Sequence, residues 1–399
     1  MFDLISSGSV SSASGFLAGA VRAGLKNNGE LDLAILYSET SCTAAGVFTT
    51  NQIKSAPVLL SQRHIAKGRA QAIVVNSGCA NACMGEQGLV DTLEMANLAA
   101  AKLGISPEEV LVASTGVIGV PLPMDKIRTG ISNIKTTREG GHDFCRAIMT
   151  TDTRPKELAV RVDSGGTKFT IGGVAKGAGM IHPNMATMLC FIATDVVVSA
   201  DFLPAALQKA VDCSFNMVSI DGDTSPSDCV FLLANGSAGN EAINFDNGGD
   251  FQEALTAVCT HLAKSMAQDG EGATKLIEVI VEGAEDRVWA RQAARTIASS
   301  PLVKAAVYGN DPNWGRIVAA LGRSGARVKE ERLDVYLKDV CVMKQGCPIP
   351  FSKTEMITTL SSSDNVLIRL CLNSGDGQAT AWGCDLSEEY VRINSAYTT

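Results

Sequence analysis

The feature that most limits how this chain can fold is the stretch KGAGMIHPNMATML at residues 176–189. It opens with two glycines and a His-Pro-Asn turn, and glycine and proline are the residues that bend a backbone sharply. An uninterrupted apolar segment, Met188–Ala193, follows and predicts a buried strand. Thr187 therefore stands at the start of a buried strand, directly after a turn that restricts the backbone.

A threonine at that point suits one kind of chemistry. Its hydroxyl is a weak nucleophile unless a base lies beside it. If the chain is cut just before Thr187, the freed α-amine, with a pKa of about 7.7–8.0, can act as that base. The threonine can make the cut itself, because its Oγ can attack the carbonyl of Ala186 to give an ester that water hydrolyses. The residues alone leave open the simpler interpretation of a common turn before an ordinary strand.

Other motifs extend along nearly the whole chain. They are Gly15–Gly19, Ala23–Lys26, Phe48–Gln52, Asn76–Cys83, Ser114–Gly119, Met149–Thr153, Asp221–Ser225, Asp269–Lys275, Gly309–Arg316 and Asn394–Thr399. In content and order they resemble the ornithine acetyltransferase family, the bifunctional acetyltransferases of arginine biosynthesis. In that family the stretch around Thr187 is the self-cleavage motif.

The resemblance implies a fold and a processing event. The implied fold is α/β, a four-layer αββα sandwich shared with self-processing N-terminal-nucleophile aminopeptidases, with a smaller C-terminal α+β domain. We expect a main domain at 1–284 and a C-terminal domain at 285–399 whose tail returns to the active site. Cleavage would give an α chain, 1–186, and a β chain, 187–399, which stay together as an α2β2 heterotetramer.

The resemblance also implies a reaction. An acetyl group would move from N2-acetyl-ornithine to glutamate by a ping-pong mechanism through an acetyl-threonine. Thr187 would be the nucleophile, and Thr115 and Gly116 would stabilise the oxyanion. The residues expected to bind the substrates are Thr150, Lys176, Thr187, Glu271, Asn394 and Thr399.

Residue chemistry gives partial support for these roles. An apolar strand at Val110–Ala113 runs into Thr115 and Gly116, which can supply a hydroxyl and a backbone N–H, the donors that an oxyanion hole needs. Lys176 can hold a carboxylate, and Glu271, between two glycines, can hold an amino group. The open alternatives are an ordinary strand end, a solvated lysine and an exposed acid after a helix cap.

Two other functions remain open at this point. One is an N-terminal-nucleophile amidohydrolase or aminopeptidase of the same fold, which would release its product without an acceptor. The other is a binding protein that is neither cut nor catalytic. The sequence also does not decide whether acetyl-CoA serves as a second acetyl donor.

Composition excludes several other classes. The net charge of −8 and the 5% of aromatic residues argue against nucleic-acid binding. No apolar run approaches the roughly 18 residues of a membrane span, and no signal peptide is recognised. The 12 cysteines lie mostly in apolar segments, which indicates buried thiols in the cytoplasm. We expect no metal or cofactor, because Cys79 and Cys83 lack a matching pair and the Asp221–Ser225 loop lacks calcium-loop spacing.

Overall fold

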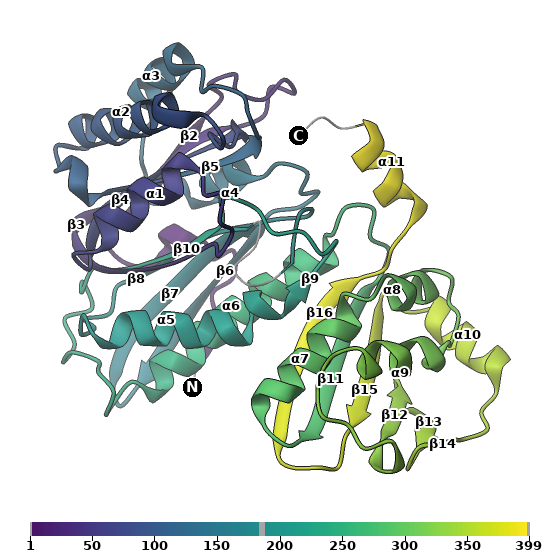
Figure 1. The fold of residues 1–399 in the computed structure, drawn as a ribbon. Helices are drawn as coiled ribbons and strands as arrows, with labels where there is room; N and C mark the ends of the chain where they lie inside the picture. Colours follow the sequence, from purple (N-terminus) through teal and green to yellow (C-terminus); the bar gives the residue numbers. More distant parts are fainter. Residues whose placement is uncertain (1, 183–187, 397–399) are drawn as a thin grey trace.

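The structure is a computed structural model that describes residues 2–182 and 188–396 (Figure 1). Three of the predicted functional residues, Ala186, Thr187 and Thr399, lie outside the described residues.

The N-terminal part is built on a nine-stranded sheet with the order β1-β6-β7-β8-β10-β3-β4-β5, in which β2 also pairs with β3. Its strands are β1 (Phe2–Leu4), β2 (Phe16–Val21), β3 (Leu33–Phe48), β4 (Arg69–Cys79), β5 (Val110–Val117), β6 (Lys156–Ser164), β7 (Thr167–Lys176), β8 (Leu189–Thr194) and β10 (Cys229–Ala234). Its helices are α1 (Ala56–Ile65), α2 (Gly85–Leu103), α3 (Met124–Asn133), α4 (Gly141–Ile148), α5 (Phe202–Cys213) and α6 (Gly249–Gln268).

One long strand makes this sheet fold over itself. β3 has 16 residues, and its pairing with β4 is interrupted between Tyr37 and Cys42. The first half of β3 pairs with β2 and β4, whereas its last residues pair with β10. The β2–β5 half and the β6–β8–β10 half can therefore lie in different layers.

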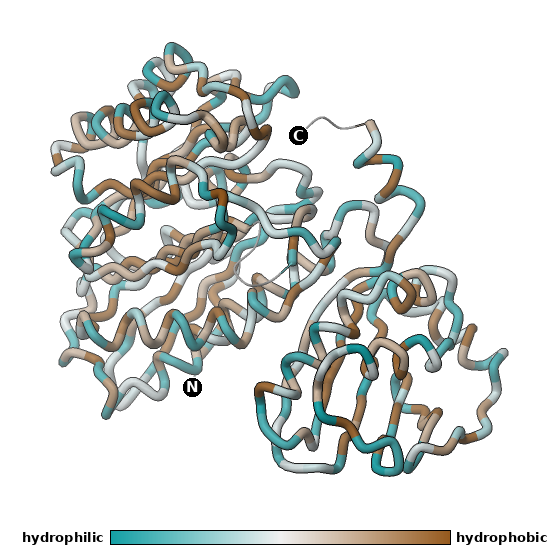
Figure 2. Tube along the Cα trace, in the orientation of Figure 1, coloured by the Kyte–Doolittle hydropathy of each residue, from teal (hydrophilic) through white to brown (hydrophobic). Residues whose placement is uncertain are grey.

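Alternation along the strands defines those layers. In β8, Leu189 and Phe191 share a buried cluster with Ile73 and Val75 of β4, so the two halves of the sheet pack face to face. The alternate residues of β8, Cys190 and Ile192, face α5 and α6 in a second cluster. Alternate residues of β4 face α2 and α3 in a third cluster. The order of layers is helix, sheet, sheet, helix, which confirms the predicted αββα sandwich, and Figure 2 shows the hydrophobic residues concentrated along the strands between the helices.

The C-terminal part has its own seven-stranded sheet with the order β14-β13-β12-β15-β11-β16-β9. Its strands are β9 (Val218–Ser219), β11 (Leu276–Ala284), β12 (Asp334–Leu337), β13 (Val340–Lys344), β14 (Cys347–Pro348), β15 (Asn365–Cys371) and β16 (Gly377–Cys384). Its helices are α7 (Arg287–Ala298), α8 (Pro301–Tyr308), α9 (Trp314–Gly322), α10 (Lys353–Ser361) and α11 (Glu388–Ala396). The predicted boundary at 284 stays a prediction, although the second sheet takes in β9 and β11, which precede residue 285.

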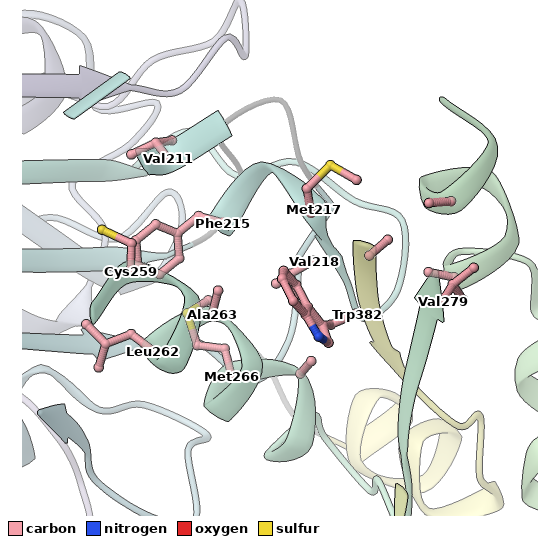
Figure 3. Packing of buried hydrophobic residues seen from close by; sticks show 14 of the residues in the cluster. Val211, Phe215, Met217, Val218, Cys259, Leu262, Ala263, Met266, Val279 and Trp382 are labelled. Atoms are coloured by element: carbon pink, nitrogen blue, oxygen red, sulfur yellow. The ribbon is translucent and has the colours of Figure 1, made fainter. Parts of the chain in front are cut away.

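The two parts share one hydrophobic core. Figure 3 shows Phe215 and Met266 on the side of α5 and α6, with Val218 of β9 next to them. Trp382 of β16 and Val279 of β11 continue the same cluster into the second sheet. The tail beyond β16 therefore leaves from a sheet that is packed firmly against the main sandwich.

The strand order mixes segments from both sides of the predicted cut. β8 and β10, which follow residue 187, lie between β7 and β3, which precede it. β8 is hydrogen-bonded to β7 along Ile171–Lys176, and β10 is hydrogen-bonded to β3. Both predicted fragments therefore contribute strands to the same sheet. Within the described part of the chain, no helix combines the length and apolar character needed to cross a membrane.

Candidate active site

Six of the predicted site residues surround one pocket of about 80 Å³. They come from distant parts of the chain and meet where β5, β7 and the loop after α6 approach α11. The residues are Thr115, Gly116, Thr150, Lys176, Glu271 and Asn394. Their assignment to particular catalytic roles stays a prediction.

The strand that carries Thr115 and Gly116 is longer than predicted. The predicted strand ends before Thr115, but β5 continues to Val117, with Gly116 paired to Gly78 of β4. Gly116 has a φ of 125°, and a Cβ at this position would overlap the backbone of Gly78. Two glycines side by side thus let the strands close up while Thr115, 7% exposed, reaches the pocket.

This close approach gives a stability prediction. We expect Gly116→Ala to lower the free energy of unfolding by roughly 2–4 kcal/mol, because backbone strain adds to an overlap that backbone atoms cannot relieve. Gly119→Ala is the matched control, since Gly119 also has a positive φ of 77° but no atom within 4 Å of the added methyl group. We expect that control to lose only about 1 kcal/mol. Urea unfolding measures both, and equal losses would contradict the packing argument.

Lys176 is the buried cation of the pocket. It is the last residue of β7 and is only 3% exposed, so it is not the solvated lysine of the alternative interpretation. Its Nζ donates to Thr150 Oγ1 at 2.7 Å and to Thr115 Oγ1 at 3.3 Å. Among the described residues no carboxylate lies within 4 Å of this ammonium. The partners that hold this buried cation within the described residues are hydroxyls, an arrangement suited to receiving an anionic group from a ligand.

The surroundings of Lys176 act on its charge in both directions. Burial lowers the pKa of its ammonium, and Lys156 lowers it further. Asp152, Asp228 and Glu271 oppose that shift by favouring the charged form. Together these effects leave the pKa of Lys176 below its ordinary value. The carboxylate of a bound ligand would raise it, as the three protein carboxylates do, and would favour the protonated form.

Next to the pocket lies an ion network that the sequence analysis does not identify. Lys156 Nζ is 2.6 Å from Asp152 Oδ1 and 2.5 Å from Asp269 Oδ2, and all three side chains are buried. Asp152 also accepts the N–H groups of Gly177 at 2.7 Å and Thr150 at 3.0 Å. Burial raises the pKa of Asp152, but Lys156 and Lys176 outweigh it and bring that pKa to about 2. The network fixes the backbone on both sides of the Lys176–Thr150 contact.

Glu271 and Asn394 form the opposite wall. Asn394 Nδ2, from α11, donates to Glu271 Oε2 at 2.8 Å, so the C-terminal helix does return to the pocket. Glu271 is 9% exposed and is not the exposed acid of the alternative interpretation. A Cβ at Gly179 would overlap its carboxylate, so the absence of a side chain at residue 179 makes room for Glu271.

Two aspartates, the half-buried Asp221 and the buried Asp228, hold the chain on either side of residues 183–187. Asp221 accepts the N–H of Met180 at 2.5 Å and of Ile181 at 2.8 Å. Asp228 accepts the N–H of Met188 at 2.8 Å, while its other oxygen has no hydrogen-bond partner within the described residues. Burial raises the pKa of Asp228 well above its ordinary range. The sequence signal for Asp221 was its turn motif, whereas nothing in the pattern singles out Asp228.

Comparisons with known proteins agree with the resemblance found in the sequence. A family model described as the ArgJ family matches residues 17–399. The chain is 53% identical over 401 residues to the arginine biosynthesis bifunctional protein ArgJ of Dehalococcoides mccartyi, covering 100% of this chain and 99% of the relative. It is 52% identical over 398 residues to the protein of the same name in Symbiobacterium thermophilum, covering 98% and 99%.

A solved structure is also similar. The crystal structure of the arginine biosynthesis bifunctional protein ArgJ from Bacillus halodurans superimposes with a TM-score of 0.51 and 43% identity. The match covers 52% of this chain and 98% of that one. On the family match and the full-length relatives, this chain belongs to the ArgJ family.

Proposed function

We propose that this protein is a glutamate N-acetyltransferase of arginine biosynthesis that uses N2-acetyl-ornithine as its donor. The observation that carries the proposal is the pocket itself, which holds a buried ammonium, Lys176, and a buried carboxylate, Glu271, beside Thr115 and Gly116. An amino-acid substrate carries the complementary pair of charges. Membership of the ArgJ family, whose named relatives belong to arginine biosynthesis, supports the same assignment.

The proposed reaction has two transfers. Thr187 Oγ attacks the acetyl carbonyl while its α-amine takes the hydroxyl proton. The carbonyl oxygen becomes negative and is stabilised by Thr115 and the N–H of Gly116. The C–N bond then breaks, the proton passes to the leaving amine, and ornithine departs from an acetyl-threonine. The amine of glutamate attacks this ester, and Thr187 regains its proton as N-acetylglutamate leaves.

We infer that Thr187 becomes an N-terminus by cleavage of the Ala186–Thr187 bond. The backbone N–H groups at Met180–Ile181 and at Met188 are held by aspartates, and these fixed points on both sides of the Ala186–Thr187 bond support the inference. The solved ArgJ chain from Bacillus halodurans matches about half of this chain while being covered almost completely itself. A chain of that extent is what a cut near residue 187 would leave.

Isotope exchange tests the proposal. We expect that protein given acetyl-ornithine and isotopically labelled ornithine, without glutamate, incorporates label into acetyl-ornithine. The fragment that begins at Thr187 should then gain the mass of one acetyl group. Transfer to glutamate without any such exchange would rule out the acetyl-threonine. Steady release of acetate without an acceptor would instead favour a hydrolase of the same fold.

Lys176 provides a second test, directed at substrate recognition. We expect Lys176→Met to reduce kcat/KM for acetyl-ornithine by about 10- to 150-fold, because a charge-assisted hydrogen bond of about 1.5–3 kcal/mol to the donor's carboxylate is lost. N-acetylputrescine, which lacks that carboxylate, is the control donor and should lose much less. An equal loss with both donors would show that Lys176 acts on something other than the carboxylate.

Further parts of the proposal concern assembly and location. We propose that the two fragments remain paired, since β8 and β10 lie between β7 and β3. We also propose that the pair dimerises to α2β2, as the family resemblance implies. Seven of the cysteines are buried free thiols, which supports a reducing compartment such as the cytoplasm. A direct assay with acetyl-CoA as the sole donor decides whether the protein also acetylates glutamate from that source.

A further inference from the structure

A second, larger pocket lies apart from the candidate active site, between α5 and α7. Its volume is about 970 Å³, near the upper end of the range for small-molecule sites. The chain as a whole has a net charge of −8, yet the charged groups of this pocket are mainly positive. They are Lys209 and Asp212 on α5, Arg287, Arg291 and Arg295 on α7, and Arg323 after α9.

The arginines of α7 are placed against the usual preferences of a helix. Arg287, Arg291 and Arg295 follow one another at intervals of four residues, so that like charges repel along one face. Arg287 also occupies the first turn, where the helix dipole disfavours a cation. Burial and the charge of Arg291 both lower the pKa of Arg295. The arrangement costs stability, and an anion bound between these side chains would remove the repulsion.

Among the described residues that line this pocket, Asp212 is the one acidic side chain. Arg291 Nη2 is 3.9 Å from Asp212 Oδ1, at the limit of an ion pair. Arg287 Nη2 contacts Cys213 Sγ at 2.7 Å rather than a carboxylate. In the part of the chain that the structure describes, neither Lys209 nor Arg323 has a carboxylate within 4 Å. Among the described residues, four cationic side chains, Lys209, Arg287, Arg291 and Arg323, thus share one acidic side chain, Asp212.

We propose that this pocket, which we term the arginine groove, binds a small ligand with two or more adjacent phosphate groups. A single carboxylate would leave most of the positive charge uncompensated, whereas a diphosphate carries charge comparable to that of the groove. The planar guanidinium presents paired N–H donors that match phosphate oxygens, and arginine is the residue preferred for such recognition. The two helices offer donors from opposite walls, which suits a ligand whose phosphates lie side by side.

The groove also reaches the chain that leads towards the cleavage point. His182 lines the groove, and its Nδ1 is 3.0 Å from Ser219 Oγ. Thr115, Lys176 and Glu271 line the other pocket and none of them lines this one. A ligand in the arginine groove would therefore bind at a site separate from that of the amino-acid substrates in the proposed reaction.

Calorimetric titration with inorganic pyrophosphate and with ADP tests the proposal without reference to catalysis. We expect saturable binding of both, weaker binding of inorganic phosphate and AMP, and a fall in affinity as salt is raised. The double variant Arg287→Gln/Arg291→Gln should bind pyrophosphate at least about 100-fold more weakly, since two charge-assisted contacts are lost. If pyrophosphate binds and ADP does not, the groove recognises inorganic polyphosphate; the reverse result shows that the nucleoside is required.

The control makes the same change of charge elsewhere. Arg161→Gln/Lys168→Gln alters two exposed residues of the β6–β7 hairpin, which do not line the groove, and should leave affinity within about twofold. If the α7 variant does not fold, Lys209→Gln/Arg323→Gln on the other walls takes its place, with the same expected loss. No saturable binding to the wild-type protein, equal affinity for phosphate and pyrophosphate, or equal losses in the groove and control variants would overturn the proposal.

Discussion

Replacing Thr187 by alanine is expected to leave a single uncut chain and to abolish acetyl transfer. The proposed mechanism uses this residue twice, since its Oγ makes the cut and then carries the acetyl group. Removing a nucleophile that acts as a unit with its base typically lowers kcat by a factor on the order of 10⁴ to 10⁶. Intact mass of the purified protein and transfer of labelled acetyl groups to glutamate measure the two effects.

Thr187→Ser is the matched control, because it keeps the hydroxyl and removes only the methyl group that restricts χ1. We expect it to be cut and to retain part of the activity. An uncut wild-type chain that still transfers acetyl groups would disprove the α-amine as the base. An uncut wild-type chain without activity would favour a binding protein, and cleavage in the alanine variant would place the nucleophile elsewhere.

Replacing Lys156 by methionine is expected to produce the largest loss of stability among the single changes considered. Its ammonium lies between Asp152 and Asp269, and the three side chains are no more than 3% exposed. Removing one partner of a buried ion pair costs about 3–5 kcal/mol, because the remaining charges stay desolvated without compensation. The free energy of unfolding in urea measures this loss.

Lys67→Met tests whether burial is the reason. Lys67 lies 2.6 Å from Glu108, the same distance as that between Lys156 and Asp152, but its side chain is 74% exposed. Exposed pairs contribute only about 0–1 kcal/mol. We therefore expect a much smaller loss in this variant. Equal losses in both variants would contradict the assignment of the Lys156 effect to desolvated carboxylates.

The local elements of the fold were predictable because their signals lie close together in the sequence. The spacing of Leu and Ala over Leu89–Leu103, followed by Gly104, predicts a helix. The structure has this helix as α2, and Gly104, with a φ of 71°, closes it in the left-handed conformation. The buried strand after residue 187 is present as β8. The sequence also predicts a strand at Asn216–Ile220. The structure reduces it to Val218–Ser219, because Phe215–Met217 form a 3-10 helix and two residues pair with β16.

The candidate site was predictable only where a motif carried it. The six expected residues that line one pocket were predicted from the family resemblance. The periodicity of the sequence could not have predicted the contact between Asn394 and Glu271, which are more than a hundred residues apart. Lys156 and Asp228 were missed because their importance depends on burial, and burial results from long-range packing. The arginine spacing on α7 is visible in the sequence, but the facing wall of α5 is not.

The interleaving of strands has a consequence for refolding. For a chain cut before Thr187, β8 and β10 belong to one polypeptide, and the flanking strands β7 and β3 belong to the other. The uncut chain can form this sheet by a unimolecular process, whereas separated fragments must first find each other in solution. Renaturation of the cut protein would then be second order and would slow on dilution. The cut would make folding a one-time event, after which the mature protein persists because it unfolds slowly.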